Sequence, residues 1–239
     1  MVACLYFSEM KIDPNNPVWP DRDRFILSKG HAAPVLYAAL ARKGYFPLDT
    51  LKTLRKSGSI LQGHPEMGAP GVDMTSGCLG EGLSAACGMA LAARFDGKDY
   101  RTYVMMGCGE MNEGQVWESA MTAAHFALDN ILVILDYNRL QFDGHVETVL
   151  NPGSMKARWQ AFGWSTLEIN GHDMKAICAG LSEARGIKGR PTVIIADTVK
   201  GKGVSFMEND YLWHSLMNEA RLQEYTDNFK KELMHGAPG

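Results

Sequence analysis

Short apolar runs alternate along the chain with segments in which apolar residues recur at helical spacing. The apolar runs predict strands over residues 25–28, 100–106, 131–135, 164–169 and 192–196. The periodic segments predict helices over residues 31–43, 48–56, 80–95, 114–128 and 173–185. Strands that are apolar throughout and alternate with helices are typical of a parallel sheet covered on both faces. The pattern therefore predicts a single α/β domain over residues 1–239.

The first ten residues have helical character but no residue that would cap a helix at its start. They also lack the basic beginning and the apolar centre of a signal peptide. This pattern favours a chain that begins inside an element of a longer ancestral domain.

Composition and charge argue against several classes of protein. Of the 239 residues, 46% are hydrophobic and 21% are charged, which is typical of a globular domain and not of a disordered chain. A net charge of −3 without any basic run argues against a nucleic-acid partner. No apolar run approaches the roughly 18–20 residues that a membrane span needs, and the run at residues 131–135 is only long enough for a strand.

The cysteines are odd in number and scattered, without a Cys-x-x-Cys pair. They stand at Cys4, Cys78, Cys87, Cys108 and Cys178. This usage predicts reduced thiols in a cytoplasmic protein and argues against a disulfide framework or a zinc site.

Candidate chemistry gathers in the loops that follow the predicted strands, where parallel sheets bind their ligands. Residues 107–114 read Gly-Cys-Gly-Glu-Met-Asn-Glu-Gly between an apolar strand and a helix. Backbone amides in such a turn, at a helix N-terminus, favour a phosphate. The same segment is compatible with a plain strand–helix turn. It also leaves open a dinucleotide site with Asp136 holding a ribose, although Asn112 stands where that motif has its third glycine.

A second polar segment begins at the end of the next predicted strand, with Asp136-Tyr-Asn138 and a later Asp143-Gly144. Side chains at two neighbouring strand ends, together with a loop carbonyl, are suited to hold a divalent cation against a diphosphate. The alternative is an Asn-containing turn with an Asp-Gly corner.

Together the two segments resemble the thiamine diphosphate signature, in which an Asn follows a Gly-Asp-Gly at the spacing seen here. The flanking segments resemble transketolase, namely residues 22–31, 62–66, 71–80, 114–118 and 198–203, and Trp213-His214. The resemblance extends from about residue 6 to residue 230 and rests on several motifs in the same order.

The resemblance covers only the amino-terminal, diphosphate-binding part of a transketolase, as in family members split into two subunits. It implies thiamine diphosphate as the cofactor and transfer of a two-carbon ketol unit from a ketose, or its phosphate, to an aldose, or its phosphate. It also implies a pyrimidine-side partner subunit that contributes a glutamate, in a heterotetramer of two copies of each chain. The resemblance also leads us to expect a Gly-His segment upstream that helps to bind substrate, and residues 1–239 begin after the place where the family has it.

The resemblance also assigns roles to individual residues. His31, His64 and His214 are expected to hydrogen-bond the cofactor and the donor sugar, and imidazoles suit proton movement near neutral pH. Glu113 is expected in a subunit-interface network that links paired active sites. Further cofactor contacts are expected from Gly77, Cys78, Leu79, Gly109, Asn138 and Lys200. Structural roles are expected for the histidines outside the motifs, which are His125, His145, His172 and His235.

The metal ligands implied by the resemblance are Cys108, Asn138 and the carbonyl of Leu140. Cys108 stands where the family has a carboxylate, and a thiol is a soft ligand that Mg²⁺ does not prefer. We therefore expect weak Mg²⁺-dependent cofactor binding, with Ca²⁺ or a softer ion such as Mn²⁺ or Zn²⁺ as a substitute. The alternative is a degenerate, non-catalytic transketolase-like subunit.

Overall fold

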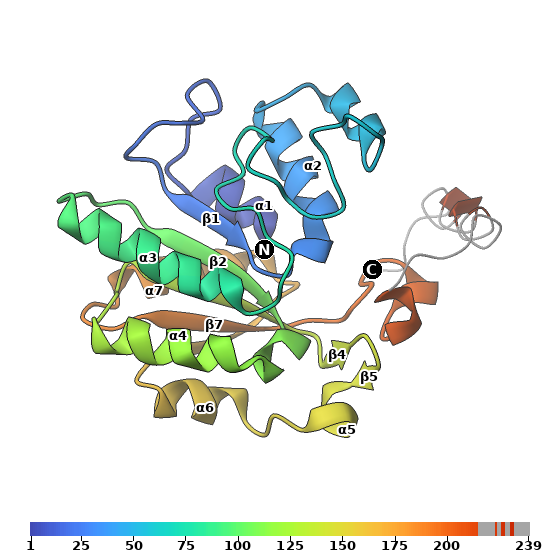
Figure 1. Cartoon of the computed structure of the whole chain (residues 1–239). Coiled ribbons are helices and arrows are strands. Elements are labelled where there is room, and N and C mark those ends of the chain that lie inside the picture. Colours follow the sequence, from blue (N-terminus) through green and yellow to red (C-terminus); the bar gives the residue numbers. More distant parts are fainter. Residues whose placement is uncertain (215–222, 224–225, 228–229, 232–239) are drawn as a thin grey trace.

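The computed structural model describes residues 1–214, 223, 226–227 and 230–231 of the chain. Its centre is a five-stranded sheet in the order β1-β2-β3-β7-β6, with every neighbouring pair parallel (Figure 1). The strands are β1 (Arg24–Leu27), β2 (Thr102–Gly107), β3 (Ile131–Tyr137), β6 (Ser165–Asn170) and β7 (Thr192–Asp197). A small antiparallel pair, β4 (Leu140–Gln141) and β5 (Gly144–His145), follows β3. All five predicted strands of the main sheet are therefore present.

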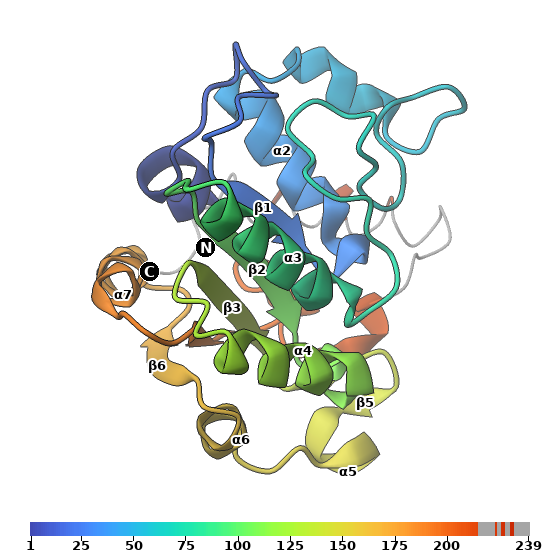
Figure 2. The same ribbon diagram turned by 60° about the vertical axis from the view of Figure 1, so that its left-hand side comes forward.

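Helices cover both faces of the sheet (Figure 2). On one face, the core contains residues of α1 (Val2–Cys4), the following π-helix (Leu5–Glu9), α2 (Ala33–Lys43) and α7 (Met174–Gly186). On the other face, it contains residues of α3 (Glu81–Phe95), α4 (Gly114–His125) and α6 (Met155–Ala161). Alternate strand residues serve opposite faces, as when Val133 joins one core and Ile134 the other. The predicted fold class is confirmed.

The register of the sheet brings the strand ends to one edge. Gly107 at the end of β2 lies opposite Asp136 in β3, and Tyr137 lies opposite Asp197 at the end of β7. Asn170, the last residue of β6, is also opposite Asp197. The loops that carry the candidate motifs therefore meet at the carboxyl edge of the sheet.

One local prediction differs from the structure, and two helices were not predicted. Residues 48–56 do not form an α-helix; a 3₁₀-helix spans Leu48–Thr53, in which no residue is buried and Leu51 is only partly buried against the core. Helices α5 (Val146–Leu150) and α6 are additional. The sequence does carry a signal for α6, since Ser154 caps its start by accepting a hydrogen bond from the Ala157 amide at 3.2 Å, and Met155 and Trp159 lie one turn apart.

Other elements agree with the sequence. The expected helical start of the chain is present as α1 and the π-helix. Helix α2 ends at Gly44, whose φ of 101° is the left-handed conformation that glycine adopts without strain. Shorter 3₁₀-helices span Gly30–Ala32, Gly109–Asn112, Ser205–Met207 and Tyr211–His214. Among the described residues, no helix is both long and apolar enough to cross a bilayer.

Candidate active site

A cavity of about 1060 Å³ opens at the carboxyl edge of the sheet. Its walls come from the loops that follow β1, β2, β3 and β7, as the sequence predicted for the ligand site of a parallel sheet. The predicted site residues that line it are His31, Leu79, Cys108, Gly109, Glu113, Asn138, Leu140, Lys200 and His214.

The floor of the cavity is the glycine turn at residues 107–113, and a buried carboxylate holds this turn in place. Glu110 is 1% exposed. It accepts hydrogen bonds from the amides of Gly80 at 2.9 Å and Gly107 at 3.2 Å, and from the Ser28 hydroxyl. Burial raises the pKa of Glu110, and these three donors oppose the increase. Glu110 thus fastens the ends of β1 and β2 to the loop before α3.

Gly109 is required by close packing within the turn. A Cβ built there would lie 2.9 Å from Cβ of Gln141 in β4, which is closer than side chains normally approach. The glycine therefore allows the β4–β5 hairpin to close over the turn. This packing places the residues between β3 and β4 directly beside Cys108.

Cys108 is a buried, hydrogen-bonded thiol. Its sulfur accepts a hydrogen bond from the Arg139 amide at 3.1 Å, and the thiol donates to the Asp136 carbonyl at 3.3 Å. Burial is the main cause that raises its pKa to about 11, and the nearby Asp136 carboxylate adds to it. The thiol is therefore protonated and uncharged at neutral pH.

The predicted metal ligands lie together but form a poor donor set for Mg²⁺. The Asn138 side-chain oxygen already accepts a hydrogen bond from the Leu140 amide at 3.0 Å. With Cys108 protonated, the three predicted ligands contribute no anionic oxygen, and Mg²⁺ prefers an all-oxygen environment. Among the described residues, no three His, Cys, Asp or Glu side chains gather closely enough to hold a metal ion. The set therefore does not fit a resident Mg²⁺ as it stands.

Beside the turn, Lys29 and Asp136 form an ion pair in which both side chains are largely buried, at 13% and 17% exposure. Asp136 also accepts a hydrogen bond from the Thr198 hydroxyl. Burial tends to raise the pKa of Asp136, but the Lys29 ammonium and these hydrogen bonds outweigh it and lower the pKa below its ordinary value. Because Asp136 already pairs with Lys29 and Thr198, the structure gives no support to the alternative in which it holds a ribose.

The upper wall of the cavity carries a cluster of basic side chains. The rings of His31 and His214 lie 4.9 Å apart, and Nζ of Lys200 is 3.3 Å from Nδ1 of His214. The Phe142 ring packs edge-on against His214 at 5.6 Å. Lys200 contacts an imidazole here, not a carboxylate. The cluster therefore has an excess of basic groups toward the cavity, which suits an anionic ligand.

Within this cluster, each positive charge makes protonation of its neighbours less favourable and so lowers their pKa values. Partial burial, followed by the charges of His214, Lys29 and Lys200, lowers the pKa of His31 to about 4. The His31 ring remains exposed to the cavity, so solvent weakens this shift. Burial and the charges of Lys200 and Lys29 also lower the pKa of His214, and burial followed by Lys29 lowers that of Lys200. Both histidines are therefore neutral at pH 7.

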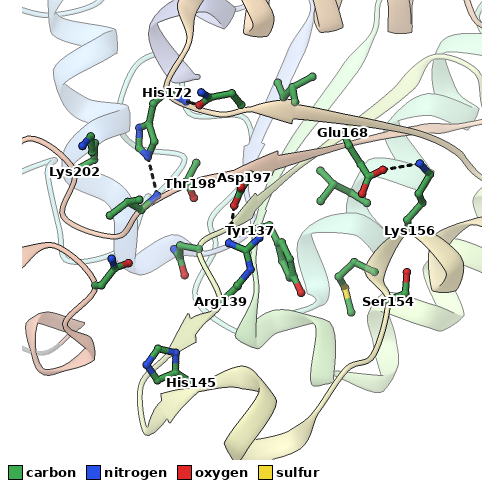
Figure 3. Close-up of a pocket in the computed structure, with 17 residues that line it drawn as sticks. Tyr137, Arg139, His145, Ser154, Lys156, Glu168, His172, Asp197, Thr198 and Lys202 are labelled. Atoms are coloured by element: carbon green, nitrogen blue, oxygen red, sulfur yellow. Dashed lines mark hydrogen bonds and ion pairs between the residues drawn. The ribbon is translucent and has the colours of Figure 1, made fainter.

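A second cavity, of about 1170 Å³, lies at the ends of β3, β6 and β7 (Figure 3). Four of its charged side chains form two ion pairs. Arg139 contacts Asp197 at 2.6 Å, and Lys156 contacts Glu168 at 2.5 Å. His172 accepts a hydrogen bond from the Val199 amide at 2.7 Å and lines both cavities.

Comparison with known proteins identifies the family. Residues 1–228 match the family model described as transketolase, thiamine diphosphate binding domain. The chain belongs to the transketolase family.

Two relatives of similar extent are transketolase subunits. The chain is 46% identical over 217 residues to the 6-deoxy-6-sulfo-D-fructose transketolase subunit SqwG of Clostridium sp. (strain MSTE9), covering 90% of this chain and 79% of that protein. It is 44% identical over 214 residues to an apulose-4-phosphate transketolase subunit of Phocaeicola vulgatus, covering 90% of this chain and 76% of the relative.

Solved transketolases share the fold. The enzyme of Campylobacter jejuni superposes with a TM-score of 0.81 at 35% identity, covering 84% of this chain and 33% of that chain. The enzyme of Leishmania mexicana superposes with a TM-score of 0.79 at 30% identity, covering 96% of this chain and 40% of that chain. The chain thus spans about a third of the solved transketolases. The predictions of the family and of a thiamine diphosphate-dependent transketolase subunit are confirmed.

Some residues predicted for this transketolase site lie outside the cavity lining. His64 lies beside it, with its ring 3.9 Å from the Cβ position of Gly77 and 3.1 Å from that of Gly30. The His64 carbonyl accepts a hydrogen bond from Tyr37 at 2.9 Å. Gly77 and Cys78 are exposed on the neighbouring loop. His235 lies outside the described residues.

Other residues of the site were not predicted. Lys29 stands in a segment that resembles transketolase, but only its partner Asp136, 107 residues further on, shows what it does. His172, for which a structural role was expected, accepts a hydrogen bond from the Val199 amide and also lines both cavities. The signal that could have indicated this is its position just after β6, at the carboxyl edge of the sheet.

Proposed function

We propose that this chain is the diphosphate-side subunit of a split transketolase, working as one domain with a separate pyrimidine-side subunit. Together they transfer a two-carbon ketol unit from a ketose to an aldose. The observation that carries this proposal is the basic cluster of His31, His214 and Lys200 facing the glycine turn in a transketolase-family chain.

The cavity fits the diphosphate of thiamine diphosphate. The turn around Gly109 offers backbone amides at the start of α4, and Lys200 brings a positive charge to the same space. Leu79 and Asn138 line the cavity between these groups. When bound, the cofactor supplies the carbanion chemistry, while the protein positions the reactants and manages protons.

We assign proton handling to the histidines. His31 and His214 are neutral at pH 7, so each ring has one nitrogen that accepts a proton and one that donates. They are therefore suited to hydrogen-bond the carbonyl and hydroxyl groups of a ketose. His64, with Gly77 and Cys78 on its neighbouring loop, is assigned to the same ligands from the rim of the cavity.

We propose anionic sugars as substrates. The two similar subunits are named for a sulfonated fructose and for a sugar phosphate. The basic side chains that line this cavity complement such groups. The proposal includes pentose phosphates as well as other sugar phosphates and sulfonated sugars.

The proposed assembly is a heterotetramer of two copies of this chain and two pyrimidine-side subunits. The relatives are named as subunits, which supports a partner chain. Glu113, exposed at the start of α4, is assigned to the network between paired sites. The free cysteines support a cytoplasmic location.

We propose that a divalent cation binds weakly with the cofactor. The Asn138 oxygen and the Leu140 carbonyl supply two oxygen donors, and Cys108 supplies none. Zn²⁺, a softer ion that accepts a sulfur ligand, is therefore expected to tolerate Cys108 better than Mg²⁺ does, and Ca²⁺ and Mn²⁺ are the other candidate ions.

The alternative function is a non-catalytic chain that binds its partner without a competent cofactor site. The observation that favours it is the buried, protonated Cys108 in place of a carboxylate.

Calorimetric titration of thiamine diphosphate into the chain mixed with its pyrimidine-side partner distinguishes the two. We expect binding in the mixture in at least one of Mg²⁺, Ca²⁺ and Mn²⁺, and ketol transfer by the same mixture. Binding by the Cys108→Asp mixture but not by the wild-type mixture would support the non-catalytic alternative. No binding by either protein would contradict a thiamine diphosphate site.

A further inference from the structure

Three sulfur atoms meet where α1 packs against α7, on the face of the sheet opposite α3 and α4. The Cys4 sulfur lies 3.6 Å from the Cys178 sulfur and 3.8 Å from the Met174 sulfur. Met174 and Cys178 are one turn apart on α7, so both side chains are on the helical face toward α1. Figure 2 shows the start of the chain lying beside α7.

The two thiols differ in their access to solvent. Cys178 is exposed, whereas Cys4 is 2% exposed. Burial, followed by the hydrogen bond from Cys178, raises the pKa of the Cys4 thiol. An oxidant in solution therefore reaches Cys178 first, and Cys4 is held beside whatever product forms there.

We propose that Cys4 and Cys178 are a redox modification site that a peroxide converts into a reversible disulfide. The Cys178 thiolate attacks one peroxide oxygen, the O–O bond breaks, and a sulfenic acid forms while water or an alcohol leaves. The Cys4 sulfur then attacks the Cys178 sulfur. The S–O bond breaks, the hydroxyl group leaves as water with the proton of Cys4, and the S–S bond forms. Two thiols lose two electrons, and the peroxide gains them.

The geometry supports the second step. A disulfide has an S–S distance of about 2.05 Å, so the sulfurs must approach by about 1.5 Å from their present contact. The exposed Cys178 side chain has room to rotate toward Cys4. A dithiol reductant reverses the bond by thiol–disulfide exchange.

The cross-link fastens a segment that borders the active-site cavity. At its far end, Glu9 of the π-helix pairs with Arg185 of α7 at 2.5 Å and accepts a hydrogen bond from Tyr103 at 2.9 Å. At its near end, Met1 lines the cavity. A bond between Cys4 and Cys178 gives the near end a covalent anchor on α7. Oxidation therefore reduces the freedom of residues 1–9 next to the site.

The test is oxidation of the full chain by hydrogen peroxide, followed by mass spectrometry without reductant. We expect the intact mass to fall by about 2 Da as two thiols lose their hydrogens. A protease digest should contain one peptide pair joined through Cys4 and Cys178, and dithiothreitol should restore both thiols. The oxidised chain should also unfold at a temperature several degrees higher, because the bond closes a long loop.

Matched variants identify the reacting pair. Cys178→Ser should remove the cross-link. Cys78→Ser should retain it, because Cys78 is also exposed but its sulfur makes no thiol contact within the described residues. Met174→Leu should retain it as well, since the thioether takes no part in the bond. A sulfinic or sulfonic acid on Cys178 beside a free Cys4 would overturn the proposal, as would a disulfide between two chains. The result is independent of thiamine diphosphate binding.

Discussion

Two aspartates at the ends of adjacent strands have ion pairs of different character. Asp136 in β3 pairs with Lys29, and the side chains of this pair are 13% and 17% exposed. Asp197 in β7 pairs with Arg139, and the side chains of that pair are 45% and 63% exposed. Breaking a buried pair leaves an uncompensated charge, whereas an exposed pair is replaced by water at little cost. The two ion pairs are therefore expected to contribute differently to the stability of this edge of the sheet.

The two cavities differ in whether their charged side chains are paired with groups of opposite charge. In the cavity of Figure 3, the pairs Arg139–Asp197 and Lys156–Glu168 already satisfy charged groups across the space. In the active-site cavity, Lys200 contacts the His214 ring and the neighbouring basic groups lower one another's pKa. An anion entering the active-site cavity removes this repulsion, while an anion entering the other cavity competes with carboxylates. This difference favours the cavity at His31, His214 and Lys200 over the cavity of Figure 3 as the proposed diphosphate site.

The largest expected effect comes from breaking the buried pair. Lys29→Met keeps the aliphatic stem and removes the charge, which leaves the Asp136 carboxylate with neutral donors such as the Thr198 hydroxyl. We expect the free energy of unfolding to fall by about 3 kcal/mol. Urea denaturation at pH 7 measures this change. Arg139→Met is the matched control and should lower stability by about 1 kcal/mol or less. Equal losses in the two variants would contradict the distinction between the pairs.

A smaller effect is expected from removing Lys200, whose ammonium contacts the His214 ring and not a carboxylate. Lys200→Ala should weaken binding of thiamine diphosphate by about 10- to 100-fold, because the proposed charge-assisted contact to the diphosphate is lost. The control is Lys202→Ala. Lys202 also lines the cavity, but it pairs with Glu208 at 3.4 Å, so we expect a change of about 3-fold or less. Calorimetry on the complex with the partner subunit measures both. A larger loss in the control would place the diphosphate elsewhere.

The sequence predicted the sheet and the edge at which the candidate site lies because both depend on local patterns. Apolar runs with helices between them determine a parallel sheet, and parallel strands end at one edge. The glycine turn and Asn138 could therefore be brought together from their positions alone. The prediction for residues 48–56 was wrong because their apolar spacing suggested an α-helix, whereas none of the residues of the resulting 3₁₀-helix is buried.

Pairings between distant segments could not be predicted in this way. Lys29 and Asp136 are far apart in sequence, and their contact depends on the order of strands in the sheet. The position of His172 likewise follows from β6 lying beside β7. Cys108 stands out in the sequence as an unusual residue for its motif, but its bonds to the Arg139 amide and the Asp136 carbonyl required the folded loop.

A third effect is expected from restoring a negative charge to the glycine turn. Cys108→Asp supplies an anionic oxygen beside Asn138, so we expect thiamine diphosphate to bind about 10-fold more tightly in Mg²⁺. Without a divalent cation the gain should vanish, because the new carboxylate lies near Asp136. Cys108→Ser keeps a neutral hydroxyl in the same place and serves as the control. A similar gain in EDTA would show that the thiol does not limit metal binding.

The smallest expected effect is on the pH dependence of stability. The pKa of His31 is about 4 in the folded chain and about 6.5 when unfolded, so between these values the unfolded chain binds more protons. The contribution of His31 to stability is therefore complete above about pH 6.5 and is lost as the pH falls toward 4. Because the ring is exposed, we expect the loss to be about 1 kcal/mol. The difference between wild type and His31→Asn in urea denaturation isolates it, since other titrating groups are common to both. Inorganic diphosphate should reduce this difference, because an anion in the cavity raises the pKa of His31. A difference that stays constant from pH 7 to pH 4 would contradict the proposed repulsion within the basic cluster.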